Sequence, residues 1–178
     1  MTSFNVAGLL REGAGASRFI RLRDHYVALG PDLELAGPLD LDLRLLRTNR
    51  GILARGEART ALRRSCSRCT DPLVEDVVVS LDEEFLPTID PDSGVALTWT
   101  DEEKDVRRID EHHEIELDPV LREELVLSEP MLVLCRPDCP GLCSECGARL
   151  DDRSHVAHEP EPDPRLAGLA RFFDERRE

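Results

Sequence analysis

Eight potential zinc ligands constrain this sequence more than any other feature. They form a C-x2-C pair, a run of four cysteines and an H-x2-H pair: Cys66, Cys69, Cys135, Cys139, Cys143, Cys146, His155 and His158. A C-x2-C pair places two thiolates on one tight turn, close enough to bind the same ion. A closed structural zinc site takes four nitrogen or sulfur ligands in a tetrahedron. Eight ligands therefore predict two complete zinc sites.

The eight ligands can be divided between two sites in more than one way. We favour one site that consists of Cys66, Cys69, Cys135 and Cys139. The second site would then consist of Cys143, Cys146, His155 and His158. The rival division joins the four cysteines of the central run, which leaves the histidines on the surface and the first pair as free thiols or an incomplete site. Gly147 follows Cys146 and suits a turn that folds the backbone toward the sulfurs.

Packing and redox chemistry are competing roles for the cysteines. A buried cysteine can act as a small apolar residue, but two C-x2-C pairs in one chain favour metal binding. A redox pair needs a βαβ context, whereas Cys66 falls between two segments with the pattern of antiparallel strands. We expect a cytoplasmic protein, because the N-terminus lacks a basic segment followed by an apolar one. No apolar run reaches the ~18–20 residues of a membrane span, so we expect no membrane contact.

Period-2 alternation of apolar residues predicts an antiparallel sheet. The clearest run is 39–45, where every second residue is leucine, and the pattern continues through 52–64 and 73–86. Short turns join these runs, which indicates a β-meander, and residues 18–24 fit a further strand. Asp118 predicts a helix N-cap with Pro119 in the first turn.

We expect an α+β protein with an antiparallel β-meander, one or two helices and a Cys-rich zinc-binding loop region. Residues 1–134 would form the sheet and helix domain, and 135–158 the zinc-binding segment packed on it. Residues 159–178 would form an acidic linker and an amphipathic helix. The apolar residues at helical spacing in that helix are Leu166, Leu169, Ala170 and Phe173, and Phe172 lies next to them in sequence. We expect them to dock on the chain's own core, with a partner protein as the alternative.

The charge of the chain is strongly acidic but unevenly distributed. The formal net charge is −14, which opposes nonspecific nucleic-acid binding and favours a basic partner or simple solubility. Residues 44–64 are the exception, with seven arginines and one acidic residue. Arg55, Arg59 and Arg63 share one face of the predicted strand. This stripe either contacts phosphates or is a solvated sheet face, and the stretch holds no aromatic residue for base stacking.

Four segments together resemble the YceD-like family of large ribosomal RNA subunit accumulation proteins. They are CSRC at 66–69, ELVLSEPMLVLC at 124–135, CRPDCPGLCSECGARLDD at 135–152 and the DPR…L close at 163–169. The resemblance implies a cytoplasmic bacterial protein that supports 23S ribosomal RNA accumulation by binding rather than catalysis. Ribosomal RNA, a pre-ribosomal particle or a basic ribosomal protein would be its partner, with no small-molecule substrate. Family members often carry further cysteines where His155 and His158 stand, and histidine can replace thiolate on zinc.

Two other functions stay open. One is a zinc-ribbon adaptor that binds a basic ribosomal protein without contacting RNA. The other is a zinc-dependent deaminase or hydrolase, because deaminases use H-x-E followed by P-C-x-x-C. His112 and Glu114 precede the C-x2-C pair at Cys143, but Leu142 stands where that motif needs proline. We therefore expect no enzymatic activity.

Overall fold

The computed structural model of the protein describes residues 2–27, 30, 33–100, 105–156, 158 and 165. The expected C-terminal helix over 166–173 lies outside these residues. The elements, in chain order, are β1 (Ser3–Asn5), α1 (Ala7–Leu10), β2 (Ser17–His25), β3 (Glu34–Leu35), β4 (Leu39–Arg47), β5 (Ile52–Ser65), β6 (Pro72–Pro87), β7 (Arg107–Ile109), β8 (Glu114–Glu116) and α2 (Asp118–Leu127).

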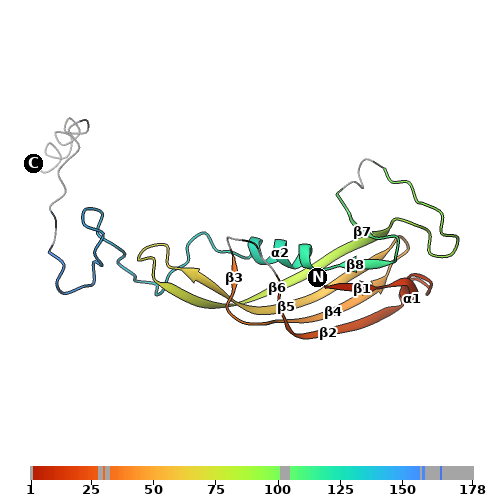
Figure 1. Cartoon of the computed structure of the whole chain (residues 1–178), viewed down its shortest axis with the longest axis horizontal. Helices are drawn as coiled ribbons and strands as arrows, with labels where there is room; N and C mark the ends of the chain where they lie inside the picture. The colour runs from red at the N-terminus through yellow and green to blue at the C-terminus, as the bar shows by residue number, and fades with distance from the viewer. Residues whose placement is uncertain are drawn as a thin grey trace, which may run out of the picture.

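One long, curved sheet forms the body of the protein (Figure 1). Its strand order is β2-β4-β5-β6-β7, with β3 paired to β5, while β1 and β8 form a separate antiparallel pair. The α+β class and the β4-β5-β6 meander agree with the sequence prediction. The β6–β7 pair is parallel, so the sheet is mixed rather than wholly antiparallel. The excursion after β6 explains this difference, since it returns the chain to the same edge in the same direction.

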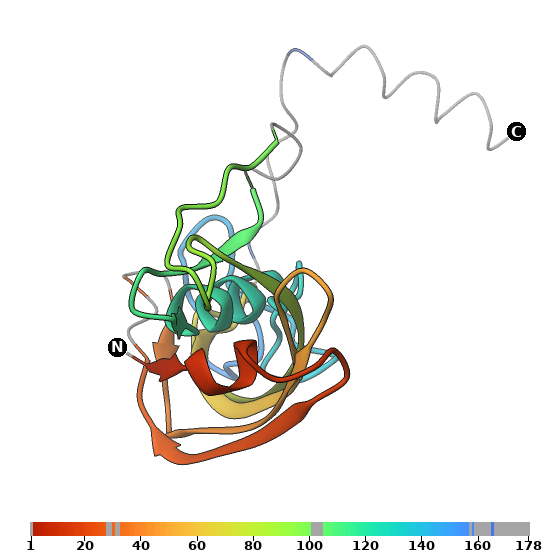
Figure 2. The ribbon, with the colours of Figure 1, turned by 90° about the vertical axis from the view of Figure 1, so that its right-hand side faces the viewer.

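The predicted alternation places one face of the sheet in the core. The four leucines of β4 from Leu39 to Leu45 are at most 2% exposed, and Leu81 and Phe85 of β6 are 1% exposed. The apolar side of α2 packs against this face with Val120, Leu121 and Leu125. Both helices lie inside the curve of the sheet (Figure 2). The opposite face of the sheet is left to solvent.

Helix α2 begins one residue earlier than an Asp118 N-cap would place it. Leu117 occupies the N-cap position, and Asp118 is the first helical residue. The Asp118 carboxylate does not cap its own helix. It accepts a hydrogen bond from the backbone N–H of Thr2 at 3.1 Å. The Asp118 side chain, which the sequence predicts to be a local helix cap, thus makes a contact with a residue far away in sequence.

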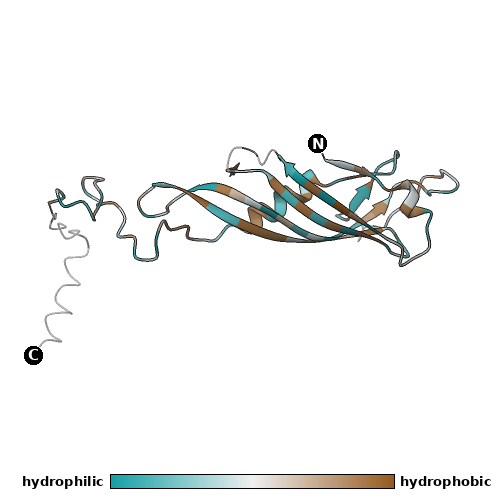
Figure 3. Ribbon diagram, turned by 90° about the horizontal axis from the view of Figure 1, so that it is seen from below, coloured by the Kyte–Doolittle hydropathy of each residue, from teal (hydrophilic) through white to brown (hydrophobic). Residues whose placement is uncertain are grey.

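The β5–β6 hairpin extends beyond the rest of the sheet (Figure 3). β4 pairs with β5 only as far as Arg59, and β3 reaches Arg63. Arg64 follows on β5, and its side chain points to the buried face of the sheet, where it is only 2% exposed. Its guanidinium lies 3.1 Å from Glu75 and 3.0 Å from Glu129. The ion pairs of Arg64 therefore join the hairpin to the segment after α2. They lie at the end of the sheet where the apolar core stops.

Residues 88–100 form an exposed excursion, as the Pro- and Asp-rich sequence indicates. A single bridge between Ile89 and Ala96 closes it on itself. The Trp99 ring lies beneath the Arg108 guanidinium, 4.5 Å from the ring centroid. Neither helix in the part of the chain that the structure describes has the length and apolar character needed to cross a bilayer.

The buried face of β4 makes a stability prediction. Leu41→Ala should lower the free energy of unfolding by about 2–5 kcal/mol, because it removes apolar packing and leaves a cavity. Leu127→Ala is the matched control, since Leu127 is 77% exposed and its truncation should change stability by no more than about 0.5 kcal/mol. Urea denaturation measures both values. Equal destabilisation by the two variants would contradict the assigned core face.

Candidate metal centre

The turn between β5 and β6 carries the first two cysteines. The backbone N–H of Cys66 donates to Asp71, and the N–H of Thr70 donates to Cys66, so residues 66–71 close tightly. Thr70 adopts a positive φ of 61° at this turn. The Cys66 and Cys69 side chains point inward and are 1% and 3% exposed. The turn therefore presents two thiols to the same small interior space.

The segment after α2 brings two more cysteines to this space. The Ser67 N–H donates to the Val133 carbonyl at 2.7 Å, and the Val133 N–H donates to the Ser67 hydroxyl at 3.2 Å. These bonds hold the chain just before Cys135 against the turn. Arg68 in turn donates to the Cys139 carbonyl at 2.8 Å. Residues separated by about seventy positions in sequence thus meet at one point.

The distances between the four sulfur atoms fit a tetrahedral zinc site. The Cys66 and Cys139 sulfurs lie 3.8 Å apart, and those of Cys69 and Cys135 lie 3.6 Å apart. Sulfurs on a tetrahedron with Zn–S bonds of about 2.3 Å are separated by about 3.8 Å. A disulfide would require about 2.05 Å. All four sulfurs lie within 4.8 Å of one another, so one ion could contact each of them.

The pKa values of the cysteine thiols in this cluster also favour a bound cation. Backbone N–H groups of Cys135 and Cys69 lower the pKa of the Cys66 thiol to about 6. Although the Asp71 N–H lowers the pKa of the Cys69 thiol, burial and the neighbouring thiols raise it to about 12. Four sulfurs this close cannot all be thiolates without a compensating charge. A bound metal would hold all four in the deprotonated form that ligates it.

A second group of four ligand atoms lies farther along the same segment. Its members are Cys143, Cys146, His155 and His158, also within 4.8 Å of one another. Gly147 has a φ of +70°, and its N–H donates to the Cys143 carbonyl at 2.9 Å, as expected for the predicted turn. The N–H groups of Cys146 and Glu145 lower the pKa of the Cys143 thiol to about 6. The His155 Nε2 atom is buried and lacks a hydrogen-bond partner, which suits a metal ligand.

Arg149 connects the two cysteine groups. Its guanidinium forms an ion pair with Asp71 in the β5–β6 turn. It also makes two hydrogen bonds to Asp151, at 2.9 and 3.1 Å, and Arg136 adds a third at 2.7 Å. These arginines hold the pKa of Asp151 well below its usual range, and Arg149 lowers the pKa of Asp71. The second turn is thereby fixed against the tip of the hairpin.

The structure assembles the eight predicted ligands in the division that we favour. In the rival division, the four cysteines of the 135–146 run would share one site, but they fall in two different groups. Sequence reasoning missed Arg149 and Gly141. At Gly141, with φ +86°, an added Cβ would lie 3.1 Å from the Arg68 carbonyl oxygen. No periodicity marks either residue, since both act on a turn far away in sequence.

The arginine stripe lies on the outer face of β5, as the alternation predicts. Each member has an acidic partner. Arg55 lies 2.7 Å from Asp82, and Arg63 lies 3.3 Å from Glu34. Arg59 pairs with Glu57 and lies 3.4 Å from Asp42. This pairing favours a solvated sheet face over phosphate contact, the two roles that the sequence left open.

The deaminase-like motif is not assembled. Glu114 belongs to β8, and the His112 side chain before it is 76% exposed. β8 and the cysteine-rich segment lie at opposite ends of the sheet (Figure 1). Among the described residues, the group around Cys143 contains His155 and His158 and neither of these two.

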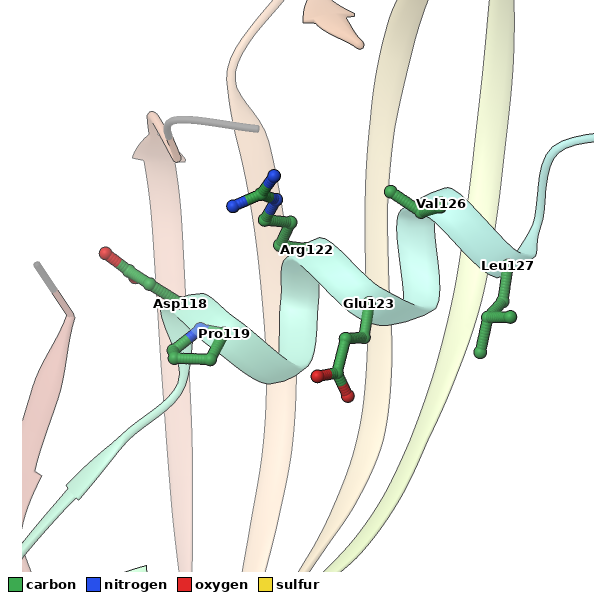
Figure 4. Close-up of a pocket in the computed structure, with 6 residues that line it drawn as sticks. All are labelled: Asp118, Pro119, Arg122, Glu123, Val126 and Leu127. Atoms are coloured by element: carbon green, nitrogen blue, oxygen red, sulfur yellow. The ribbon is translucent and has the colours of Figure 1, made fainter. Parts of the chain in front are cut away.

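A hollow of about 710 Å³ runs along the outer side of α2. The residues that line it come from this helix, and their side chains point in several directions rather than toward one centre (Figure 4). Glu123 is already paired with Arg107. The hollow therefore shows no convergent set of catalytic groups among the described residues.

Comparison with known proteins identifies the family. The sequence model of the family described as "Large ribosomal RNA subunit accumulation protein YceD" matches residues 54–173, about two thirds of the chain. The chain belongs to the YceD family. The matched range contains all eight ligand residues and the whole β5–β6 hairpin apart from its first two residues. The resemblance in the cysteine block and its flanking segments is thus confirmed.

Relatives of the YceD chain occur in mycobacteria and in a plant. An uncharacterized protein of Mycobacterium tuberculosis is 38% identical over 135 residues, 76% of this chain and 62% of that protein. One from Mycobacterium leprae is 30% identical over 118 residues, covering 66% and 52%. The "Large ribosomal RNA subunit accumulation protein YCED homolog 1, chloroplastic" of Zea mays is 27% identical, covering 66% and 47%. The chain spans less than two thirds of each relative, and no solved structure matches it significantly.

The Arg149 contacts make a prediction about local stability. Arg149→Gln should speed amide exchange in residues 141–150 by up to about fivefold, because partly exposed ion pairs are worth up to about 1 kcal/mol. Arg18→Gln is the control, since it removes an ion pair with Glu12 far from the cysteines. Hydrogen–deuterium exchange with mass spectrometry resolves the two regions. Unchanged exchange in 141–150 would contradict the proposed link.

Proposed function

We propose that this YceD-family protein is a ribosome-biogenesis accessory protein that supports accumulation of the 23S ribosomal RNA of the large subunit. The family match over residues 54–173 carries the proposal. The maize relative bears a name of the same meaning. The protein would act by binding a ribosomal RNA, a pre-ribosomal particle or a ribosomal protein, and it would do so in the cytoplasm. Catalysis has no assembled site in the described part of the chain to support it.

We propose further that each of the two ligand groups holds one structural zinc ion. The first would be bound by four thiolates and the second by two thiolates and two imidazoles. Zinc suits these sets because it prefers sulfur and nitrogen ligands in a tetrahedron. With four protein ligands each, the two sites would leave no open position for a substrate. Such closed sites stabilise folds rather than catalyse reactions.

An adaptor that binds a basic ribosomal protein is the second candidate. Ion pairing of the Arg55, Arg59 and Arg63 stripe is the observation that favours it, because these arginines are not free for phosphates. The chain also carries 37 acidic against 23 basic residues, which complements a basic protein. In this function the protein would protect a ribosomal protein before assembly and affect ribosomal RNA indirectly.

Native mass spectrometry tests the zinc proposal. The full chain should carry two zinc ions, and the double variant His155→Ala/His158→Ala should carry one, because the four-cysteine site remains intact. His112→Ala is the matched control and should keep both ions, since His112 lies outside both groups. A metal-free protein would contradict the proposal. So would a double variant with undiminished zinc, the result expected from the rival division.

Genetic complementation tests the cellular function. Deletion of the gene in its host should lower the ratio of 23S to 16S ribosomal RNA, and the wild-type gene should restore it. Cys66→Ser/Cys69→Ser should fail to restore it, because the hairpin tip would be without two ligands of its metal. We expect Arg55→Ala/Arg59→Ala/Arg63→Ala to restore it, since all three guanidinium groups are paired. An unchanged ratio in the deletion strain would contradict the function, and failure of the triple variant would restore the phosphate-contact hypothesis.

A further inference from the structure

The outer face of the sheet carries an exposed aromatic ring that sequence analysis did not connect with the arginines. Phe19 on β2 is 73% exposed, although it sits in a regular strand where an apolar ring could have been placed inward. Cross-strand register puts Phe19 beside Arg44 of β4, and Arg44 beside Arg55 of β5. One row across three strands therefore joins an aromatic side chain to two arginines.

Arg44 is closely associated with this ring. Its guanidinium carbon lies 5.6 Å from the centroid of Phe19. Its hydrogen bond is to the Ser17 hydroxyl at 3.2 Å, and it forms no ion pair with any residue that the structure describes. Arg21, two residues along the strand from Phe19, has a side chain 77% exposed and only a distant contact of 3.7 Å with Asp42. Both guanidinium groups are therefore available to an incoming anion.

A shallow hollow of about 470 Å³ lies among these side chains. Its charged lining consists of four arginines and one acidic residue: Arg21, Arg23, Arg44, Arg55 and Asp42. Asp42 is already shared by Arg23 at 2.8 Å and Arg59 at 3.4 Å. Even when Asp82, the partner of Arg55, is counted, positive charges here outnumber negative ones by two. In a chain of net charge −14, this excess is a marked local reversal.

We propose that Phe19, Arg21 and Arg44 form a platform that binds single-stranded RNA, with a base stacked on the Phe19 ring and phosphates at the two arginines. The choice of RNA rests on the proposed function. Bases stack on exposed aromatic rings and on guanidinium planes, and arginines supply the phosphate contacts. A duplex keeps its bases stacked inside and offers none to Phe19. An acidic protein would match the arginines but would leave the exposed ring unused.

The platform lies partly outside the sequence that defines the family. Phe19, Arg21 and Arg44 precede residues 54–173, whereas Arg55 belongs to them. It is also separate from the metal centre. The hollow lies over β2, β4 and β5, while the first cysteine group closes the far tip of the β5–β6 hairpin. Figure 3 looks onto the sheet from the side opposite α2 and shows the polar and apolar positions that alternate along its strands.

Fluorescence anisotropy with a labelled single-stranded RNA tests the platform. The full chain as purified is titrated into an unstructured RNA of about 12 nucleotides, within the roughly 4–16 that such platforms cover. Binding should saturate with a Kd below about 100 µM. Phe19→Ala should weaken it about 5- to 150-fold, the effect of removing one base–aromatic stack. Phe19→Trp should preserve it.

Charge variants and exposed controls complete the test. Arg44→Gln should reduce the salt dependence of log K by about 0.7, because one guanidinium no longer neutralises a phosphate. Val78→Ala should bind normally, because Val78 is 59% exposed on β6 but lies away from the hollow. Arg11→Gln should also bind normally, since Arg11 follows α1 on the other side of the sheet. Phe19 and Arg44 are both exposed, so these variants should fold, which circular dichroism verifies.

The outcomes separate this proposal from the proposed function. Equal affinity of wild type and Phe19→Ala overturns the platform, as does tighter binding of a duplex or of a polyglutamate peptide than of single-stranded RNA. In each of these cases the complementation result still decides the cellular function. Conversely, a Phe19-dependent preference for single-stranded RNA upholds the platform even where deletion of the gene leaves 23S ribosomal RNA unchanged.

Discussion

The meeting of four cysteine sulfurs at the tip of the β5–β6 hairpin is the interaction on which this end of the protein depends. Three of the four thiols are buried, but among the described residues the apolar side chains packed with them are just Leu73, Leu134 and Leu142. Few other strands support the hairpin there, since β4 ends its pairing at Arg59. A metal ion would supply the stability that so small an apolar cluster lacks, because metal binding of this kind contributes folding free energy.

The placement of the cysteine-rich segment follows from fixing that tip. Segment 131–139 is held to the turn, the Arg149 contacts then fix the second ligand group, and a continuous sheet leads from there to the outer face around Phe19. In the proposed function, the metal centre is a structural anchor, and the exposed surfaces of the sheet meet the partner. This division explains how a chain with no assembled catalytic site in its described part could still act on ribosomal RNA accumulation through binding.

Local pattern predicted the parts of the structure that local physics controls. The leucines of β4 alternate with polar residues, so only one pairing register buries all of them. The short spacing between cysteines likewise restricts which thiols can lie on the same turn. The parallel β7, the Asp118 contact with Thr2 and the Arg149 contacts could not be predicted, because each joins residues far apart in sequence. Phe19 was overlooked for the same reason. It belongs to a different strand from the arginine stripe, and only the registers of β2 on β4 and of β4 on β5 bring it into one row with Arg55.

Zinc-edge X-ray absorption spectroscopy on the purified full chain is the most direct test of the metal centre. One site of four sulfurs and one of two sulfurs and two nitrogens predict an average of three sulfurs and one nitrogen per zinc. The Zn–S distance should be about 2.3 Å and the Zn–N distance about 2.0 Å. A spectrum with four sulfurs and no nitrogen would contradict the two-site arrangement. A shell dominated by oxygen would contradict a closed structural site altogether.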